Sequence, residues 1–190
     1  MEQVSKPETE EILRLAESTL SVEGDFVELG CYKGDTSLKL AKLLKPSDKK
    51  LWLYDSFAGL PEKTREDQSA AGDQFKKGEL FVTKREVVLK FKRAGLRVPI
   101  IKKAFFEDLD PETDLPGKIA FAFLDGDLYG SIKTSLKLVA PKLDKQGTII
   151  VHDYNNPELP GSSRAVDEFL SQNPNFRLSQ NHTLAILRTN

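Results

Sequence analysis

Several features that would define a protein class are scarce in this 190-residue sequence. Its single cysteine, Cys31, excludes an internal disulfide and a cysteine-rich zinc site. No apolar run approaches the roughly 20 residues of a membrane-spanning helix, and the acidic, polar start MEQVSKPETEE predicts no secretory signal. Lysine and arginine number 28 against 29 acidic residues, so there is no basic excess for nucleic acid or an anionic membrane. We therefore expect one cytoplasmic domain with a small-molecule partner; self-association into a homo-oligomer stays open.

The chain does have short apolar runs that alternate with amphipathic segments. Residues 1–21 predict an N-terminal helix, and the polar stretch at 62–80 predicts a lid. Five apolar runs separated by helices predict a parallel sheet covered on both faces, and the last two runs predict an antiparallel hairpin. The fold class is thus α/β, a Rossmann-like doubly wound, mostly parallel seven-stranded sheet. Strands are expected at 25–30, 50–55, 98–103, 118–125, 147–153, 175–180 and 183–189, and further helices at 35–45, 81–95, 130–143 and 162–172.

Acidic residues stand at or beside the ends of four predicted strands. They are Glu28, Asp55, Asp125 and Asp153. In a parallel sheet the carboxyl ends of the strands meet at one edge, where ligands bind. Buried carboxylates are costly unless they have partners, so four of them at equivalent places predict one cleft lined with acceptors.

The segment VELGCYKGDTS follows the first strand. Gly30 and Gly34 would allow a tight turn and close approach to a ligand, and the next helix begins near Thr36. The pattern is not GxGxxG, because Tyr32 stands at the second glycine. Glu28 would repel a diphosphate and attract an amino group. A plain tight turn is the simpler alternative.

These residues resemble a known family. The pattern E-x-G-x-x-x-G, with an acid ending the second strand, is similar to class I S-adenosylmethionine-dependent methyltransferases. The segments LYDSFAGLPE, LDGDLYGSIKTSLKLVAPKLDKQGTIIVHDY and SSRAVDEFL resemble the TylF-type macrocin O-methyltransferase family, over roughly residues 22 to 188. The resemblance implies an S-adenosylmethionine-dependent enzyme that methylates a small-molecule hydroxyl, such as a sugar of a natural product or of a glycan precursor.

The resemblance also implies a binding site for the cofactor. Glu28 and the glycine loop would hold its methionine part, and Thr36 its carboxylate. Asp55 would accept from the ribose hydroxyls, although a helix cap is the simpler role for this residue. The expected cofactor residues are Glu28, Gly30, Tyr32, Gly34, Thr36, Asp55, Ser56, Phe106, Glu107 and Asp125.

A metal site and a general base are expected in the acidic cluster. By resemblance, Asp125 and Asp153 would hold Mg²⁺. His152 stands where the family often has another acid and would favour Mn²⁺, Fe²⁺ or Zn²⁺ if it is a ligand; Asn155 or Asn156 could supply an oxygen instead. Asp127 is the expected catalytic base and His152 the competing one. The simpler alternatives are a turn at Asp-Gly-Asp with Asp127 capping a helix, and a core histidine at 152.

Two other functions stay open. One is an NAD- or nucleotide-binding oxidoreductase on the same sheet, which Glu28 and Tyr32 disfavour. The other is a non-catalytic domain that keeps the cofactor pocket, which His152 leaves open.

Overall fold

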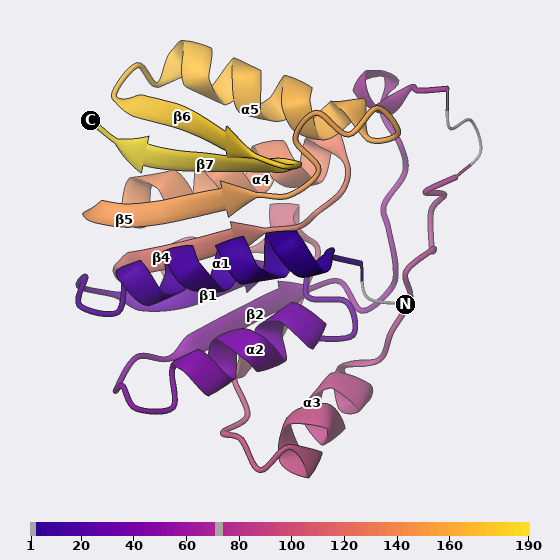
Figure 1. Cartoon of the computed structure of the whole chain (residues 1–190). Helices are drawn as coiled ribbons and strands as arrows, with labels where there is room; N and C mark the ends of the chain where they lie inside the picture. Colours follow the sequence, from indigo (N-terminus) through magenta and orange to yellow (C-terminus); the bar gives the residue numbers. More distant parts are fainter. Residues whose placement is uncertain (1–2, 71–73) are drawn as a thin grey trace.

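A seven-stranded sheet runs through the computed structural model, which describes residues 3–70 and 74–190 (Figure 1). The strand order is β3-β2-β1-β4-β5-β7-β6. The first five strands are parallel, and β7 is antiparallel to both β5 and β6. The predicted fold, including its C-terminal hairpin, is therefore confirmed. The strands are β1 Asp25–Leu29, β2 Leu51–Asp55, β3 Ile100–Lys103, β4 Ile119–Leu124, β5 Leu143–Val151, β6 Phe176–Asn181 and β7 Leu184–Thr189.

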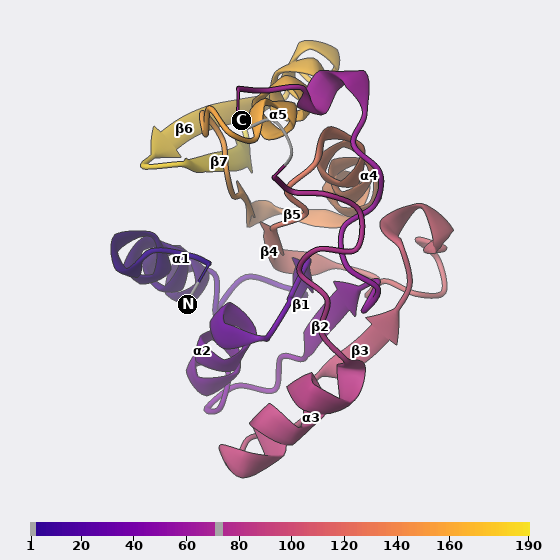
Figure 2. The same ribbon diagram turned by 90° about the vertical axis from the view of Figure 1, so that its right-hand side faces the viewer.

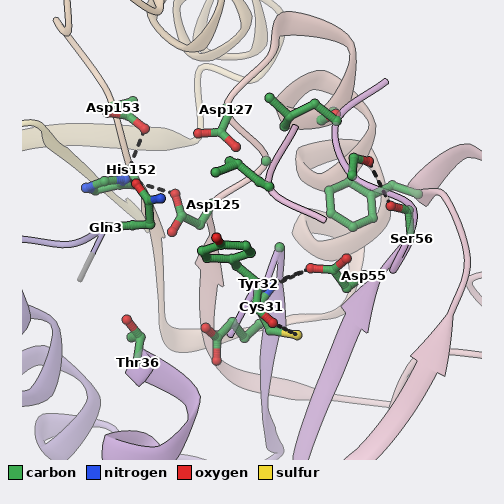
Figure 3. A pocket seen from close by; sticks show the side chains of 18 of the residues that line it. Gln3, Cys31, Tyr32, Thr36, Asp55, Ser56, Asp125, Asp127, His152 and Asp153 are labelled. Atoms are coloured by element: carbon green, nitrogen blue, oxygen red, sulfur yellow. Dashed lines mark hydrogen bonds and ion pairs between the residues drawn. The ribbon is translucent and has the colours of Figure 1, made fainter. Parts of the chain in front are cut away.

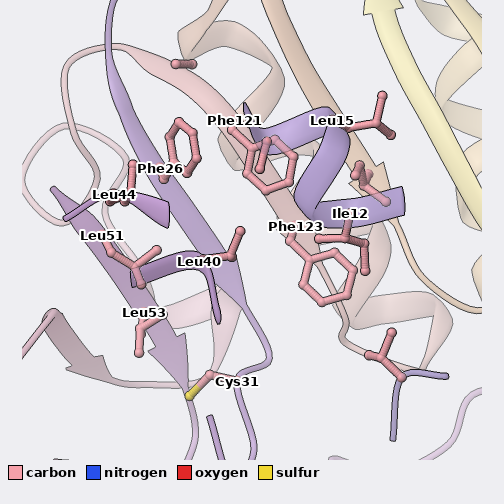
Figure 4. Close-up of a cluster of buried hydrophobic side chains, with 14 of the residues drawn as sticks. Ile12, Leu15, Phe26, Cys31, Leu40, Leu44, Leu51, Leu53, Phe121 and Phe123 are labelled. Atoms are coloured by element: carbon pink, nitrogen blue, oxygen red, sulfur yellow. The ribbon is translucent and has the colours of Figure 1, made fainter. Parts of the chain in front are cut away.

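Helices cover both faces of the sheet (Figure 2). Residues of α1, α2 and α3 pack on one face, where Phe26, Phe121 and Phe123 are fully buried (Figure 4). Residues of α4 and α5 pack on the other face, against alternate residues of the same strands. Within the described residues, no helix has both the length and the apolar character needed to cross a bilayer. The helices are α1 Lys6–Ser18, α2 Asp35–Leu43, α3 Lys84–Arg93, α4 Tyr129–Val139 and α5 Pro160–Gln172, with short 3-10 turns η1 Arg65–Asp67, η2 Phe106–Asp108 and η3 Ala140–Lys142.

The helix boundaries follow local capping chemistry. Ser5 and Glu8 form a capping box at the start of α1. Thr83 and Glu86 do the same for α3, so this helix starts three residues later than the predicted 81. The helix predicted at 130–143 ends at Val139 and continues as η3, which contains a proline. Strand β5 correspondingly begins at 143 rather than 147.

The connection between β2 and α3 crosses the carboxyl ends of the strands, which face the viewer in Figure 2. We call residues 56–83 the β2–α3 connection. Backbone hydrogen bonds between Leu60 and both Gly78 and Glu79 close it into a loop. Residues 71–73 of the lid predicted at 62–80 lie outside the described residues, and mobility of this segment stays a prediction.

Candidate active site

A cleft of about 220 Å³ opens at the carboxyl ends of the strands (Figure 3). Loops after β1, β2, β4 and β5, together with η2, bring most of the predicted site residues to its walls. Gly34 is not among the lining residues; it precedes α2 with a φ of 72°, so its part is to turn the chain. The predicted residues that line the cleft are Glu28, Gly30, Tyr32, Thr36, Asp55, Ser56, Phe106, Glu107, Asp125, Asp127, His152 and Asp153.

Asp55 orders the loop after β1. Its Oδ2 accepts hydrogen bonds from the backbone N–H groups of Cys31 at 3.0 Å and Tyr32 at 2.9 Å, and its Oδ1 accepts from Phe57 at 2.8 Å. Burial raises the pKa of Asp55, and the backbone donors oppose that rise. Asp55 therefore holds two turns together and does not cap a helix. Unused lone pairs on its carboxylate remain at the cleft wall.

Gly30 is required by close packing between neighbouring loops. Its φ is 90°, and a Cβ at this position would lie 1.9 Å from the backbone oxygen of Asp125. The first glycine of the loop thus lets the chain after β1 lie directly against the chain after β4.

Glu28 is a buried carboxylate that lacks a full set of partners. Its residue is 1% exposed, and Oε2 has no hydrogen-bond partner within the described part of the chain. Burial raises the pKa of Glu28 well above its ordinary value; the hydroxyl of Ser37 opposes that rise, and the charges of Asp125 and Asp55 add to it. A carboxylate that is buried, unpaired and part of a cleft wall suits a cationic ligand group.

His152 lies between acidic side chains. Its Nδ1 is 2.9 Å from Oδ1 of Asp125 and 3.0 Å from Oδ2 of Asp153, while its Nε2 is 3.8 Å from Oε2 of Glu8. Burial disfavours the charged ring, but these carboxylates raise the pKa of His152 above its ordinary value. Asn156 donates to the other oxygen of Asp153 at 2.7 Å. His152 is thus a buried histidine whose ring nitrogens have partners, which is compatible with the simpler alternative of a core histidine, and it also lies close to two candidate metal ligands.

Glu8 was missed by the sequence analysis. It reaches this cluster from α1, accepting from Ser5 Oγ at 2.5 Å and from the backbone N–H of Thr183 at 3.2 Å. His152 contributes most to lowering the pKa of Glu8, and burial opposes this. The sequence S-x-x-E at residues 5–8 is typical of a capping box. The contact of Glu8 with His152, which directly follows β5, depends on how α1 packs and could not be read from that motif.

Asp127 lies in the turn between β4 and α4, where its backbone has a φ of 59°. Burial raises the pKa of Asp127 well above its ordinary value, and the charges of Asp125 and Asp153 add to it. The residue before α4 is Leu128, and its cap carries no side-chain hydrogen bond. Asp127 therefore does not cap α4, contrary to the simpler alternative.

One wall of the cleft is apolar, which the sequence did not predict. Leu60, Leu128 and Leu159 form a small buried cluster, and the partly buried Phe75 and Leu80 pack against it. All of these except Leu128 line the cleft. No periodic pattern marks these residues in the sequence, because they come from irregular segments.

Two other residues lie as expected. Cys31 is buried in the loop after β1, and burial raises the pKa of its thiol. His182 is exposed in the turn of the hairpin and is not among the residues that line the cleft.

Known proteins are similar to this chain in sequence and in fold. Residues 10–176 match the family described as Macrocin-O-methyltransferase (TylF). The chain is 32% identical, over 142 residues, to 8-demethyl-8-(2,3-dimethoxy-alpha-L-rhamnosyl)-tetracenomycin-C 4'-O-methyltransferase of Streptomyces olivaceus, covering 70% of this chain and 54% of that protein. It is 30% identical, over 159 residues, to demethyldecarbamoylnovobiocin O-methyltransferase of Streptomyces niveus, covering 78% and 59%. The chain thus spans less than two thirds of the length of these relatives.

Solved structures of methyltransferases have a similar fold. The O-methyltransferase NovP superposes with a TM-score of 0.81 at 27% identity, over 96% of this chain and 79% of that one. The calicheamicin methyltransferase CalS11 has the same fold, with a TM-score of 0.77 at 20% identity, over 97% and 80% of the two chains. Since the family match covers most of the chain and the fold agrees with it, this protein belongs to the TylF macrocin O-methyltransferase family.

Proposed function

We propose that this chain is an S-adenosylmethionine-dependent O-methyltransferase acting on a small-molecule hydroxyl, with a sugar hydroxyl of a natural product as the first candidate. The observation that carries the proposal is Glu28, a buried carboxylate with an unpaired oxygen beside a glycine loop that Asp55 holds in place. The sulfur nucleoside carries an ammonium group, which would supply the missing partner. The names of the relatives support a glycosylated natural product as acceptor.

The remaining lining residues suit the other parts of the cofactor. Thr36, in the first turn of α2, would meet its carboxylate, because free N–H groups gather at a helix start. Asp55 would accept from the ribose, with Ser56 beside it. Phe106 and Glu107 on η2 would contact adenine. When bound, the cofactor would supply an electrophilic methyl group, and these residues would position it for the acceptor.

Asp127 is the proposed general base, in preference to His152. Both ring nitrogens of His152 face carboxylates, so this ring has no free position for a proton from the acceptor. Asp127 lines the cleft beside the apolar wall, where an acceptor hydroxyl could approach it. A nearby base that takes the hydroxyl proton assists transfer of the methyl group.

A divalent cation is the second part of the proposal. Ligand atoms of Asp125, His152 and Asp153 all lie within 4.8 Å of one another. The separations of 2.9 and 3.0 Å from Nδ1 to the two carboxylates suit a shared proton. They also suit neighbouring ligands of an octahedral ion, which lie about 3 Å apart for metal–ligand bonds of about 2.1 Å. Glu8 on the far side of the ring matches the usual partner of a ligating histidine. Such an ion would bind the acceptor oxygen and lower its pKa.

Titration calorimetry tests these assignments. The protein is expected to bind S-adenosylhomocysteine and not NADH; the reverse result would indicate the oxidoreductase alternative. Mn²⁺ binding, followed by electron paramagnetic resonance, should weaken in Asp153→Asn; a wild-type protein that binds no Mn²⁺ would contradict the metal site. Transfer of labelled methyl to a panel of glycosides should cease in Asp127→Asn without loss of S-adenosylhomocysteine affinity. Cofactor binding without transfer to any acceptor would favour the non-catalytic alternative.

A further inference from the structure

Asp67 is an almost fully buried carboxylate outside the cofactor cleft. It lies at the end of η1 in the β2–α3 connection and is 2% exposed. Its Oδ2 accepts from the backbone N–H of Thr64 at 2.8 Å and from its hydroxyl at 2.9 Å. Its Oδ1 accepts from the backbone N–H of Tyr129, the first residue of α4, at 2.7 Å. This carboxylate therefore joins the connection to a helix far away in the sequence.

Asp67 caps the start of α4 through this contact, and the start of α5 packs against the same carboxylate. Neither helix has a side-chain cap of its own, and neither has an acid in its first turn. Asp67 supplies an acceptor and a negative charge where free N–H groups and the positive end of the helix dipole favour them. Gly161, in the first turn of α5, lies so close that a Cβ there would be 2.0 Å from Oδ1 of Asp67 and 2.8 Å from the backbone nitrogen of Tyr129.

Asp67 is linked to both sides of the proposed acceptor site. On one side, Tyr129 is two residues from Asp127, and Ser162 of α5 donates to the backbone oxygen of Asp127 at 3.1 Å. On the other side, the connection carries Leu60 to the apolar wall of the cleft. The carboxylate therefore lies between the segment that carries part of the wall and the segment that carries Asp127.

Further contacts fasten the same part of the connection to α5 and the loop before it. Arg164 donates to the backbone oxygen of Glu66 at 2.5 Å, and Ser69 donates to that of Glu158 at 2.9 Å. These two contacts are exposed, so water competes for them, whereas those of Asp67 are shielded. The hydrogen bonds of Asp67 are therefore expected to contribute more to holding this part of the connection than the two exposed ones.

We propose that Asp67 is a positioning residue for the acceptor half of the site. It holds the β2–α3 connection against the starts of α4 and α5, and so fixes the position of the apolar wall relative to Asp127. This rests on the proposed function. Glu28 and Asp55 belong to the ends of β1 and β2, Ser56 stands at the opposite end of the connection's first part, and the hydrogen bonds of Asp67 go to Thr64 and Tyr129 instead. The expected signature is therefore a defect toward the acceptor with cofactor affinity kept.

Two glycines offer a matched pair of variants. Gly161→Ala places a methyl group against the Asp67 carboxylate and should displace it, whereas Gly130→Ala in α4 meets nothing within 4 Å. Asp67→Ala removes the fastening, and Asp67→Asn keeps one acceptor oxygen. We expect kcat/KM for the acceptor to fall about 10- to 100-fold in Asp67→Ala and Gly161→Ala, with partial recovery in Asp67→Asn and no change in Gly130→Ala. The affinity for S-adenosylhomocysteine should stay within about twofold, as for residues that do not touch the ligand.

Amide hydrogen exchange tests the same contact without any measurement of methyl transfer. In the wild-type protein the Tyr129 amide should be protected, and Asp67→Ala should speed its exchange and that of residues 57–70 while leaving α2 unchanged. Unchanged exchange at Tyr129, or a fall in S-adenosylhomocysteine affinity equal to the fall in kcat/KM, would overturn the proposal. A wild-type protein that binds no S-adenosylhomocysteine would instead contradict the proposed function, and the exchange result would still decide the role of Asp67.

Discussion

Replacing Glu28 with glutamine should make the unliganded protein more stable and its cofactor binding weaker. Glu28 is 1% exposed, and its Oε2 has no hydrogen-bond partner among the described residues. The buried hydroxyl of Ser37 lies beside this carboxyl group and opposes the rise of its pKa. An amide at position 28 cannot ionise as the pH rises, and it places a donor where the unpaired Oε2 stands.

The magnitude follows from the cost of an unpaired buried group, about 1–3 kcal/mol. Glutamine should recover about 1–2 kcal/mol of that, which in a chain of this size raises Tm by roughly 2–8 °C. A hydrogen bond to a charged group contributes about 1.5–3 kcal/mol. Losing the charge opposite the ligand's ammonium group should therefore weaken S-adenosylhomocysteine binding by about 10- to 100-fold.

The stability difference should depend on pH. Because burial raises the pKa of Glu28, the folded protein holds this proton more tightly than the unfolded chain does. The resulting stabilisation is complete below the pKa of unfolded glutamate, about 4.3. It is lost as pH rises through the folded pKa. The advantage of Glu28→Gln should therefore be small near pH 4 and grow toward pH 8.

Denaturant unfolding of both proteins between pH 5 and 8, with calorimetry at pH 8, measures both effects. A variant that is no more stable than the wild type at any pH would show that Glu28 is not an unpaired charge in the unliganded protein. Unchanged affinity for S-adenosylhomocysteine would refute its contact with the ammonium group.

Three further predictions concern neighbouring residues. Asp55→Ala should both destabilise the protein by about 1–3 kcal/mol and weaken S-adenosylhomocysteine binding, because the carboxylate orders the loop after β1; equal affinity in calorimetry would contradict this. Cys31 should react slowly with thiol reagents at pH 7, since burial raises the pKa of its thiol, and bound S-adenosylhomocysteine should slow it further; rapid labelling would argue against a closed loop. Chelation by EDTA should lower methyl transfer, and adding Mn²⁺ should restore it, but not in Asp125→Asn. Full activity in EDTA would show that transfer needs no metal at this cluster, where His152 would then share a proton with the two carboxylates.

Much of the cleft follows from strand ends. Glu28, Asp55 and Asp125 each end or directly follow an apolar run, and a parallel sheet necessarily gathers such positions at one edge. The boundaries of the elements were predicted less accurately. The predicted helix start at 81 neglected the cap at Thr83. The predicted strand start at 147 missed Leu143, which pairs with Ile119, and the three polar residues that follow it in β5.

The sequence by itself determined the fold class, the glycine loop and the acidic rim of the cleft, because each depends on local period or on position along a strand. Only the tertiary structure decided which groups complete the site. Glu8 meets His152 because α1 packs across the sheet, and Asp67 meets Tyr129 across 62 residues of chain. Such contacts join irregular or distant segments, whose meeting depends on packing and leaves no periodic trace in the sequence.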